Sequence, residues 1–197
     1  MNLALFDFDG TITARAMLSD FMRFAITPRR LVVGKVLLAP AVVGYKLGIV
    51  SSSAIRSRVV RFGLRGEPLA RLDQIGERFS RQVLPDVLRA QAMERIAWHK
   101  AQGDVVVVVS GALDVYLRHW CRQHELALIC SALEVVDGHY SGRYQGRQCV
   151  GAEKPRRVLQ QYNPGDFDSV YAYGDTREDL DLLGIADRKY FKGQERV

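Results

Sequence analysis

The chain has 197 residues, of which 48% are hydrophobic and 25% are charged, and its formal net charge is +6. This length and hydrophobic content can build one substantial core, which excludes a disordered chain and favours a single domain with room for an inserted lobe. The apolar amino terminus is not preceded by basic residues and is cut short by Asp7 and Asp9, so it does not match an export signal and predicts a cytoplasmic protein.

The first part of the chain predicts one strand followed by a helical insertion. Leu3 to Phe8 is a short apolar run that enters Asp-Phe-Asp-Gly-Thr, which is typical of a buried strand ending in a polar loop. Residues 15 to 81 show no two-residue alternation, so we expect only helices there. Capping residues and prolines place these helices at about 17–25, 28–49, 54–63 and 68–83.

The rest of the chain alternates strands with helices. A helix over 86–102 leads to five valines, and later apolar runs predict further strands, at 105–109, 126–130, 170–173 and 189–191, with a hairpin over 135–144. Helical patterns between them predict an α/β fold with a Rossmann-like, mainly parallel sheet and an all-helical cap inserted after the first strand. We expect a core of residues 1–14 and 86–197 and a cap of residues 15–85. Such sheets bind ligands at the carboxyl ends of their strands.

The positive charge is concentrated in the predicted cap. Residues 15–81 hold thirteen Arg and Lys against four Asp and Glu, a net +9, so the remainder of the chain carries −3. A basic lobe suits anionic partners such as a phosphorylated substrate or an anionic membrane surface, although solvated helix faces would look the same. The sequence pI of about 9.4 would also permit nucleic-acid binding, but no recognition motif accompanies it and we predict no such partner.

An apolar segment inside the cap, Leu31 to Val50, needs separate consideration. Spanning a bilayer takes about 20 apolar residues, whereas Lys35 and Lys46 interrupt this segment and Pro40 would kink it. A helix buried in the cap explains the composition. A helix lying at a membrane interface, or lining an apolar substrate pocket, explains it as well. Peripheral contact with the inner face of the membrane therefore remains open.

The cysteines and histidines offer no metal-binding pattern. Three cysteines cannot all pair, and none has the spacing of a metal site, so we expect reduced thiols, mostly buried, at Cys121, Cys130 and Cys149. The four histidines are scattered without ligand spacing, and we assign them no role.

Two carboxylates, Asp7 and Asp9, lie two residues apart where the first strand ends. This spacing would direct both into one crevice, where their repulsion needs a cation or a shared proton. Phosphoryl transfer would use both: one carboxylate attacks phosphorus, and the other donates a proton to the leaving oxygen and then activates water. Gly10 would let the chain turn sharply beside the phosphate.

Three later segments supply what such a reaction needs. Ser110-Gly111 offers a hydroxyl and a backbone N–H to phosphate oxygens, and Lys154, at a helix start, could neutralise the transferring group. Asp175 and Asp179 follow another strand four residues apart, which a first helical turn would bring to one side. With Asp7 they can form an oxygen-rich site for Mg²⁺, a cation that binds through carboxylates together with substrate phosphate.

These four motifs, in this order and spanning Asp7 to Asp179, resemble the haloacid dehalogenase superfamily and, within it, the phosphoserine phosphatase branch. The resemblance implies that Asp7 is the nucleophile and Asp9 the general acid and base. It implies that Ser110, Gly111 and Lys154 bind the substrate phosphate, and that the Asp7 carboxylate, the Asp9 backbone carbonyl and Asp175 bind Mg²⁺. Thr11 and Asp179 are then supporting residues. The resemblance also implies a mobile cap over a Rossmann-like core.

The resemblance to the phosphoserine phosphatases themselves fails in the cap. Those enzymes carry a glutamate after the first motif that receives the substrate amine, whereas Ile12 to Leu18 contains no acid, and Asp20 lies beyond it. We therefore expect a small anionic phosphomonoester other than phosphoserine. The basic, apolar cap is also similar to a bacterial branch that includes phosphatidylglycerophosphatase C, so the alternative is a membrane-surface lipid-phosphate phosphatase. A phosphotransferase, or a binding module without catalysis, are further alternatives.

Overall fold

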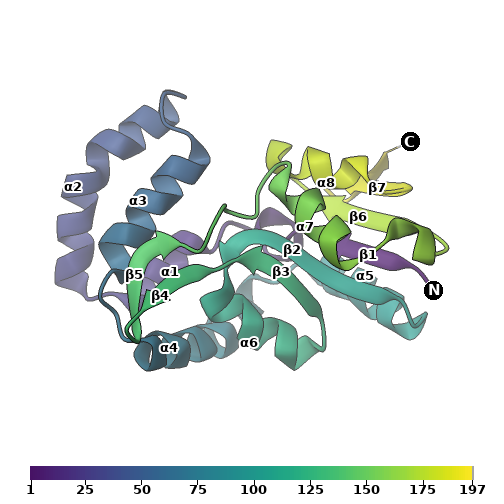
Figure 1. Cartoon of the computed structure of the whole chain (residues 1–197), viewed down its shortest axis with the longest axis horizontal. Helices are drawn as coiled ribbons and strands as arrows, with labels where there is room; N and C mark the ends of the chain where they lie inside the picture. The colour runs from purple at the N-terminus through teal and green to yellow at the C-terminus, as the bar shows by residue number, and fades with distance from the viewer. Residues whose placement is uncertain (197) are drawn as a thin grey trace.

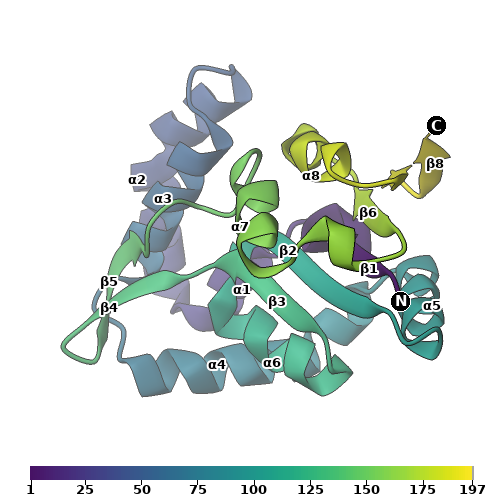
Figure 2. The same cartoon turned by 45° about the vertical axis from the view of Figure 1, so that its right-hand side comes forward.

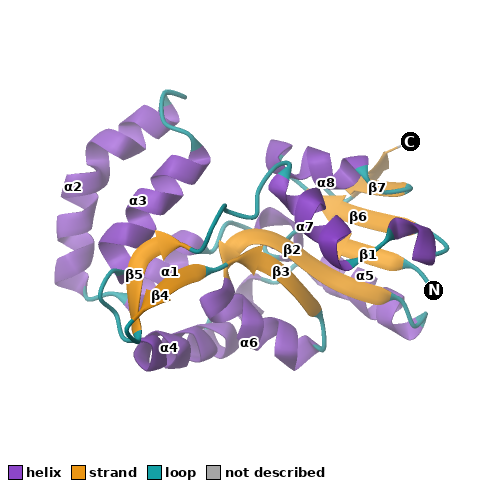
Figure 3. Ribbon diagram, viewed as in Figure 1, coloured by secondary structure: helices purple, strands orange, loops and turns teal. Residues whose placement is uncertain are grey.

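A computed structural model describes residues 1–196, and Figure 1 shows their arrangement. Their centre is a six-stranded sheet in the order β3-β2-β1-β6-β7-β8, coloured orange in Figure 3. All neighbouring strands in it are parallel except β7 and β8, which are antiparallel. The predicted mainly parallel α/β sheet is therefore confirmed. The strands are β1 (Leu3–Phe6), β2 (Val105–Leu113), β3 (Ala127–Ser131), β6 (Val170–Gly174), β7 (Arg188–Phe191) and β8 (Gln194–Arg196), with a separate hairpin of β4 (Leu133–Val136) and β5 (His139–Tyr144).

Helices cover both faces of the sheet. Ala4 and Phe6 of β1 face one core, to which α5 (Ala90–Ala101) and α6 (Asp114–His124) contribute apolar side chains. Leu3 and Leu5 face the other core, which α7 (Glu153–Gln161) and α8 (Leu180–Gly184) complete. Because successive side chains of a strand point to opposite faces, a strand covered on both sides must be apolar throughout. This explains the uninterrupted apolar runs in β1 and β2.

Four helices between β1 and α5 form the insertion, as the sequence predicted. Thr27 caps the second of them by accepting a hydrogen bond from the backbone N–H of Arg30 at 3.4 Å, and Ser51 caps the third through the N–H of Ala54 at 3.2 Å. These side chains satisfy backbone donors that a helix start leaves free. The helices are α1 (Leu18–Ala25), α2 (Pro28–Lys46), α3 (Ser52–Leu64) and α4 (Leu69–Gln82).

The insertion is not uniformly separate from the core. The rings of Phe21 in α1, Phe79 in α4 and Tyr116 in α6 lie 5.0 to 5.2 Å apart in one buried cluster. Only α2 and α3 project away from the sheet as a helical hairpin, as Figures 1 and 2 both show. The boundary between a cap of residues 15–85 and the core stays a prediction, because α1 and α4 share their apolar contacts with α6.

Several expected boundaries shift, each for a local reason. β1 ends at Phe6, and the chain then turns over Phe8–Ile12, where Gly10 has φ +91°. β2 continues through Ser110 and Gly111 to Leu113, with a register shift against β3, so these two residues lie in the strand and not in a loop after it. The helix expected from 86 starts at Ala90, after a short turn, η2 (Leu84–Val87). β8 was not predicted.

The prediction that the apolar segment of residues 31–50 is a helix buried in the cap is wrong. Within α2 only Gly34 and Ala41 are buried, and the side chains between them are largely exposed. No helix within residues 1–196 is both long and apolar enough to cross a membrane. The helix therefore has an apolar surface without being a core helix or a membrane span.

The contact between α4 and α6 generates a stability prediction. A Cβ atom at Gly76 would lie 2.0 Å from the backbone carbonyl oxygen of Val115, which cannot move without displacing α6. We expect Gly76→Ala to lower the free energy of unfolding by about 1–3 kcal/mol, the usual cost of overpacking. Gly184→Ala is the matched control, since a Cβ there meets nothing within 4 Å, and it should change stability by less than about 0.5 kcal/mol. Urea unfolding of both variants tests this, and equal stability would contradict it.

Candidate functional site

The site begins where β1 ends. β1 pairs with β2 on one side and β6 on the other, so the carboxyl ends of all three strands lie at one edge of the sheet. Asp7 is buried there, and its backbone N–H donates to the carbonyl of Tyr173 at 2.9 Å. The carboxylate of Asp9 accepts from the backbone N–H of Met17 at 3.0 Å, which anchors it near the start of α1. The two acids therefore have different partners although only Phe8 separates them.

Glycine is required between these acids and the loop after β6. A Cβ at Gly10 would lie 2.3 Å from a carboxylate oxygen of Asp175, and the positive φ of Gly10 also disfavours other residues. The hydroxyl of Thr11 donates to the Asp175 carboxylate at 3.2 Å. The turn after β1 and the loop after β6 are thus packed directly against each other.

Lys154 occupies the centre of the site. Its side chain is 2% exposed, and its Nζ atom lies 2.6 Å from Asp7 Oδ1 and 2.5 Å from Asp179 Oδ1. It enters from the first turn of α7, so three segments distant in sequence meet at one ammonium group. Burial opposes the charged form of Lys154, but the two carboxylates outweigh it and raise the pKa of the amine.

Asp179 is held by the loop as well as by the lysine. Its Oδ2 atom accepts from the backbone N–H groups of Asp175 at 3.2 Å and Thr176 at 2.9 Å, and from the Thr176 hydroxyl at 2.8 Å. Burial favours the neutral acid, but Lys154 and these donors together lower the pKa of Asp179. Asp179 is therefore a fixed anion whose two oxygens already have partners.

The remaining acids are poorly neutralised. Burial raises the pKa of Asp7 to about 7, against the opposing effect of Lys154, and raises the pKa of Asp9 to about 6, against the opposing hydrogen bond from Met17. Burial also raises the pKa of Asp175. Four acids in this region face one buried lysine, so the site has a surplus of negative charge.

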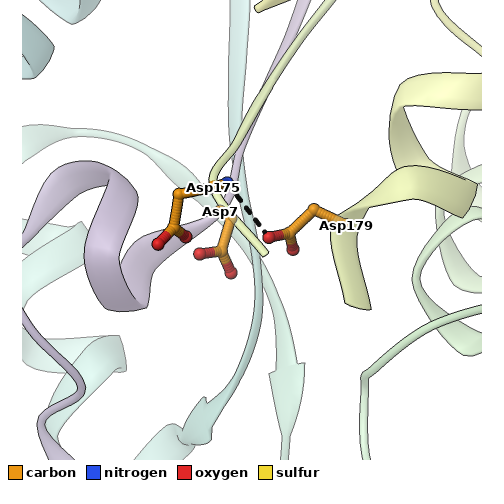
Figure 4. A group of neighbouring side chains, drawn as sticks. All are labelled: Asp7, Asp175 and Asp179. Atoms are coloured by element: carbon orange, nitrogen blue, oxygen red, sulfur yellow. Dashed lines mark hydrogen bonds between the residues drawn. The ribbon is translucent and has the colours of Figure 1, made fainter. Parts of the chain in front are cut away.

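The carboxylates of Asp7, Asp175 and Asp179 form a cluster that fits a cation (Figure 4). One oxygen from each lies within 4.8 Å of the others. Because both Asp179 oxygens are engaged, Asp7 and Asp175 are the carboxylates free to bind a hard cation such as Mg²⁺, which commonly uses one or two carboxylates. The Asp9 carboxylate is not in this cluster. The group of Asp9 predicted to bind the metal is its backbone carbonyl, and that assignment stays a prediction.

The predicted phosphate-binding residues surround the same cavity. A cavity of about 480 Å³ is lined by Asp7, Asp9, Ser110, Gly111 and Lys154. Ser110 is buried, and its Oγ atom accepts from the backbone N–H of Ala112 at 3.1 Å, which leaves the hydroxyl hydrogen free to donate. All the sequence-predicted residues are therefore brought together or adjoin one another, while their chemical roles stay predictions.

The cap contributes residues that sequence reasoning missed. Tyr45, Ser52 and Arg56 of the projecting hairpin line the cavity beside Glu178. The Arg56 guanidinium donates to both oxygens of Glu178 at 3.0 and 3.1 Å and to Gln148 at 3.0 Å, and Ser52 also bonds to Glu178. Glu178 lay inside a recognised motif, but no sequence spacing relates it to a cap residue 122 positions away.

Comparison with known proteins defines the class. Residues 4–184 match the family model for haloacid dehalogenase-like hydrolases, so the chain belongs to that family. The predicted family is confirmed.

Particular relatives are consistent with this assignment. Protein CicA of Caulobacter vibrioides is 29% identical over 196 residues, covering 96% of this chain and 85% of that protein. A Bordetella pertussis protein of unknown function has a TM-score of 0.82 and 26% identity over 95% of this chain and 88% of its own. A phosphoserine phosphatase studied as a phospho-aspartyl intermediate analogue has a TM-score of 0.62 and 21% identity over 95% and 84% of the two chains, and shares the fold.

The buried lysine gives a prediction for the site. Removing it with Lys154→Met leaves the Asp7 and Asp179 carboxylates buried without their cation, so the free energy of unfolding at neutral pH should fall by roughly 3–5 kcal/mol. Lys100→Met removes an exposed pair with Glu125 and should change stability by less than about 0.5 kcal/mol. Urea unfolding without added metal measures both. Equal stabilities would show that Lys154 is not needed to compensate these acids.

Proposed function

We propose that this protein is a Mg²⁺-dependent phosphatase that hydrolyses a phosphomonoester through an aspartyl-phosphate intermediate on Asp7. The observation that carries the proposal is the buried contact of Lys154 with Asp7 and Asp179 beside a cavity that Asp9 and Ser110 also line. The family is one of hydrolases, and the phospho-aspartyl analogue of a phosphoserine phosphatase on the same fold supports the proposed intermediate.

In the first step an Asp7 oxygen forms a bond to phosphorus while the bond to the leaving oxygen breaks. Asp9 donates its proton to that oxygen, and a pKa raised by burial to about 6 keeps part of Asp9 protonated near neutral pH. The Ser110 hydroxyl, the Gly111 N–H and the Lys154 amine would bind the phosphoryl oxygens. The Asp7 and Asp175 carboxylates with the Asp9 carbonyl would hold Mg²⁺, which supplies positive charge against the transferring group.

In the second step water attacks the phosphorus of the aspartyl phosphate. Asp9, now ionised, accepts the proton from water, and the bond between phosphorus and the Asp7 oxygen breaks. Phosphate leaves, and both acids return to their starting states. An alcohol that entered instead of water would make the protein a phosphotransferase, which is the less favoured alternative.

The substrate proposal is a small anionic phosphomonoester other than phosphoserine, acted on in the cytoplasm. Arg56 supports an anionic substrate, since it is the cationic group that the cap presents to the cavity, although Glu178 pairs with it in this structure. A second candidate is a lipid phosphate at the membrane surface. The exposed apolar side chains of α2 favour it, because the same hairpin contributes Tyr45 and Ser52 to the cavity.

The nucleophile provides the first test. Asp7→Asn should reduce phosphate release at least about a thousandfold, because an amide cannot form the covalent intermediate. Asp86→Asn, an exposed acid outside the site, should leave the rate unchanged. Assays should cover aryl phosphates, soluble phosphorylated metabolites and phospholipids, and the class turned over fastest decides between the two candidates. Undiminished release by Asp7→Asn with every substrate would refute the mechanism.

The metal provides a second test. Chelation by EDTA should abolish phosphate release, and added Mg²⁺ should restore it. Asp175→Asn removes one of the two free carboxylates, so the Mg²⁺ concentration for half-maximal activity should rise at least about tenfold. Titration calorimetry with Mg²⁺ alone should show the same weakening. Asp181→Asn, an exposed acid on α8, serves as the control. Full activity in EDTA would exclude a metal-dependent reaction.

A further inference from the structure

The outer surface of α2 is an apolar face that nothing within residues 1–196 covers. Val36 is 70% exposed and Leu37 is 64% exposed, in the middle of the helix. The inner side of α2 packs on α3, where Gly34 lies so close to Phe62 that a Cβ would approach its ring at 2.5 Å. The exposed apolar residues of α2 and the turn after it are Val32, Val33, Val36, Leu37, Val42, Val43, Tyr45, Leu47 and Ile49. A contiguous apolar surface of this kind marks an interaction site.

The same hairpin carries only positive charge. Residues 21–66 contain nine Arg and Lys and no Asp or Glu. Three of the cations are neutralised by acids outside this stretch, Arg23 by Asp20, Arg30 by Glu67 and Arg56 by Glu178. Among the described residues Lys35 and Lys46, which lie between exposed apolar residues of this segment, make no salt bridge. The surface therefore combines apolar side chains with cations that lack counterions.

This combination selects one kind of partner. A second copy of the chain would bring another surface with cations and no acids against this one, and like charges repel. Nucleic acid would satisfy the cations but would gain nothing from exposed valine and leucine side chains. An anionic lipid bilayer satisfies both features, because its phosphates attract the lysines and its acyl region accepts the apolar side chains.

The geometry points to a docking surface: we propose that α2 and the turn Leu47–Val50 lie in the interface of an anionic lipid bilayer, parallel to its plane. Pro40 and the two lysines prevent α2 from crossing the bilayer, and no described helix qualifies as a span. Tyr45 belongs to this surface and also lines the cavity beside Asp7. Docking would therefore hold the cavity close to the membrane. The proposal concerns membrane binding and holds whichever substrate the site accepts.

Sedimentation of the full chain with vesicles tests the proposal without any substrate. The protein should sediment with vesicles of phosphatidylcholine and phosphatidylglycerol, and much less with phosphatidylcholine alone. Rising salt should weaken the binding, because the attraction to anionic lipid is screened. Val36→Ser combined with Leu37→Ser should weaken it at least about tenfold, since these residues would no longer bury apolar area. Lys35→Glu should weaken it by a similar factor through reversed charge.

A matched pair of valines elsewhere on the surface supplies the control. Val135 and Val136, which are 41% and 49% exposed on the β4–β5 hairpin, should tolerate serine with unchanged vesicle binding. Thermal unfolding at an unchanged temperature would show that each variant is folded. The proposal is overturned if the wild type does not sediment with anionic vesicles, or if the α2 variants bind as it does. A wild-type dimer that the α2 variants dissociate would also overturn it, because a second copy would then cover this face.

Discussion

The ammonium group of Lys154, held between Asp7 and Asp179, is the interaction on which the rest of the site depends. It joins the end of β1, the start of α7 and the loop after β6. Burying a lysine costs several kcal/mol unless oppositely charged groups surround it, so each of these segments must be placed correctly for the others to be tolerated. The site is therefore a consequence of the fold, and also a constraint on how the sheet edge can be arranged.

The surplus of acid around that lysine follows from the same geometry. Parallel strands present their carboxyl ends at one edge, which brings Asp7 and Asp175 together and packs Gly10 against Asp175. Burial then raises the pKa values of these two acids, because only one buried cation faces them. The repulsion between these buried acids destabilises the fold. Binding of a divalent cation together with an anionic phosphate would relieve that repulsion.

The insertion divides into two parts that serve different purposes. α1 and α4 belong to the packed interior, since Phe21 and Phe79 meet Tyr116 of α6. α2 and α3 form the projecting hairpin. Arg56 of this hairpin contacts the core beside the cavity through its salt bridge with Glu178. One hairpin thus carries the surface proposed to meet the membrane and the residues that face the proposed substrate, which would couple docking to access.

The sequence by itself determined the α/β class, the helical insertion, the family and the acids and lysine at the strand ends, because each depends on local periodicity or on a short motif. It ended β2 too early, at residue 109, because Ser110 and Gly111 interrupt the apolar run without ending the strand. Only the tertiary structure decided that both carboxylate oxygens of Asp179 have hydrogen-bond partners, that Arg56 pairs with Glu178, and that α2 is exposed. These features depend on contacts between segments far apart in the chain, and an apolar helix has the same composition whether a protein core or a membrane surface covers it.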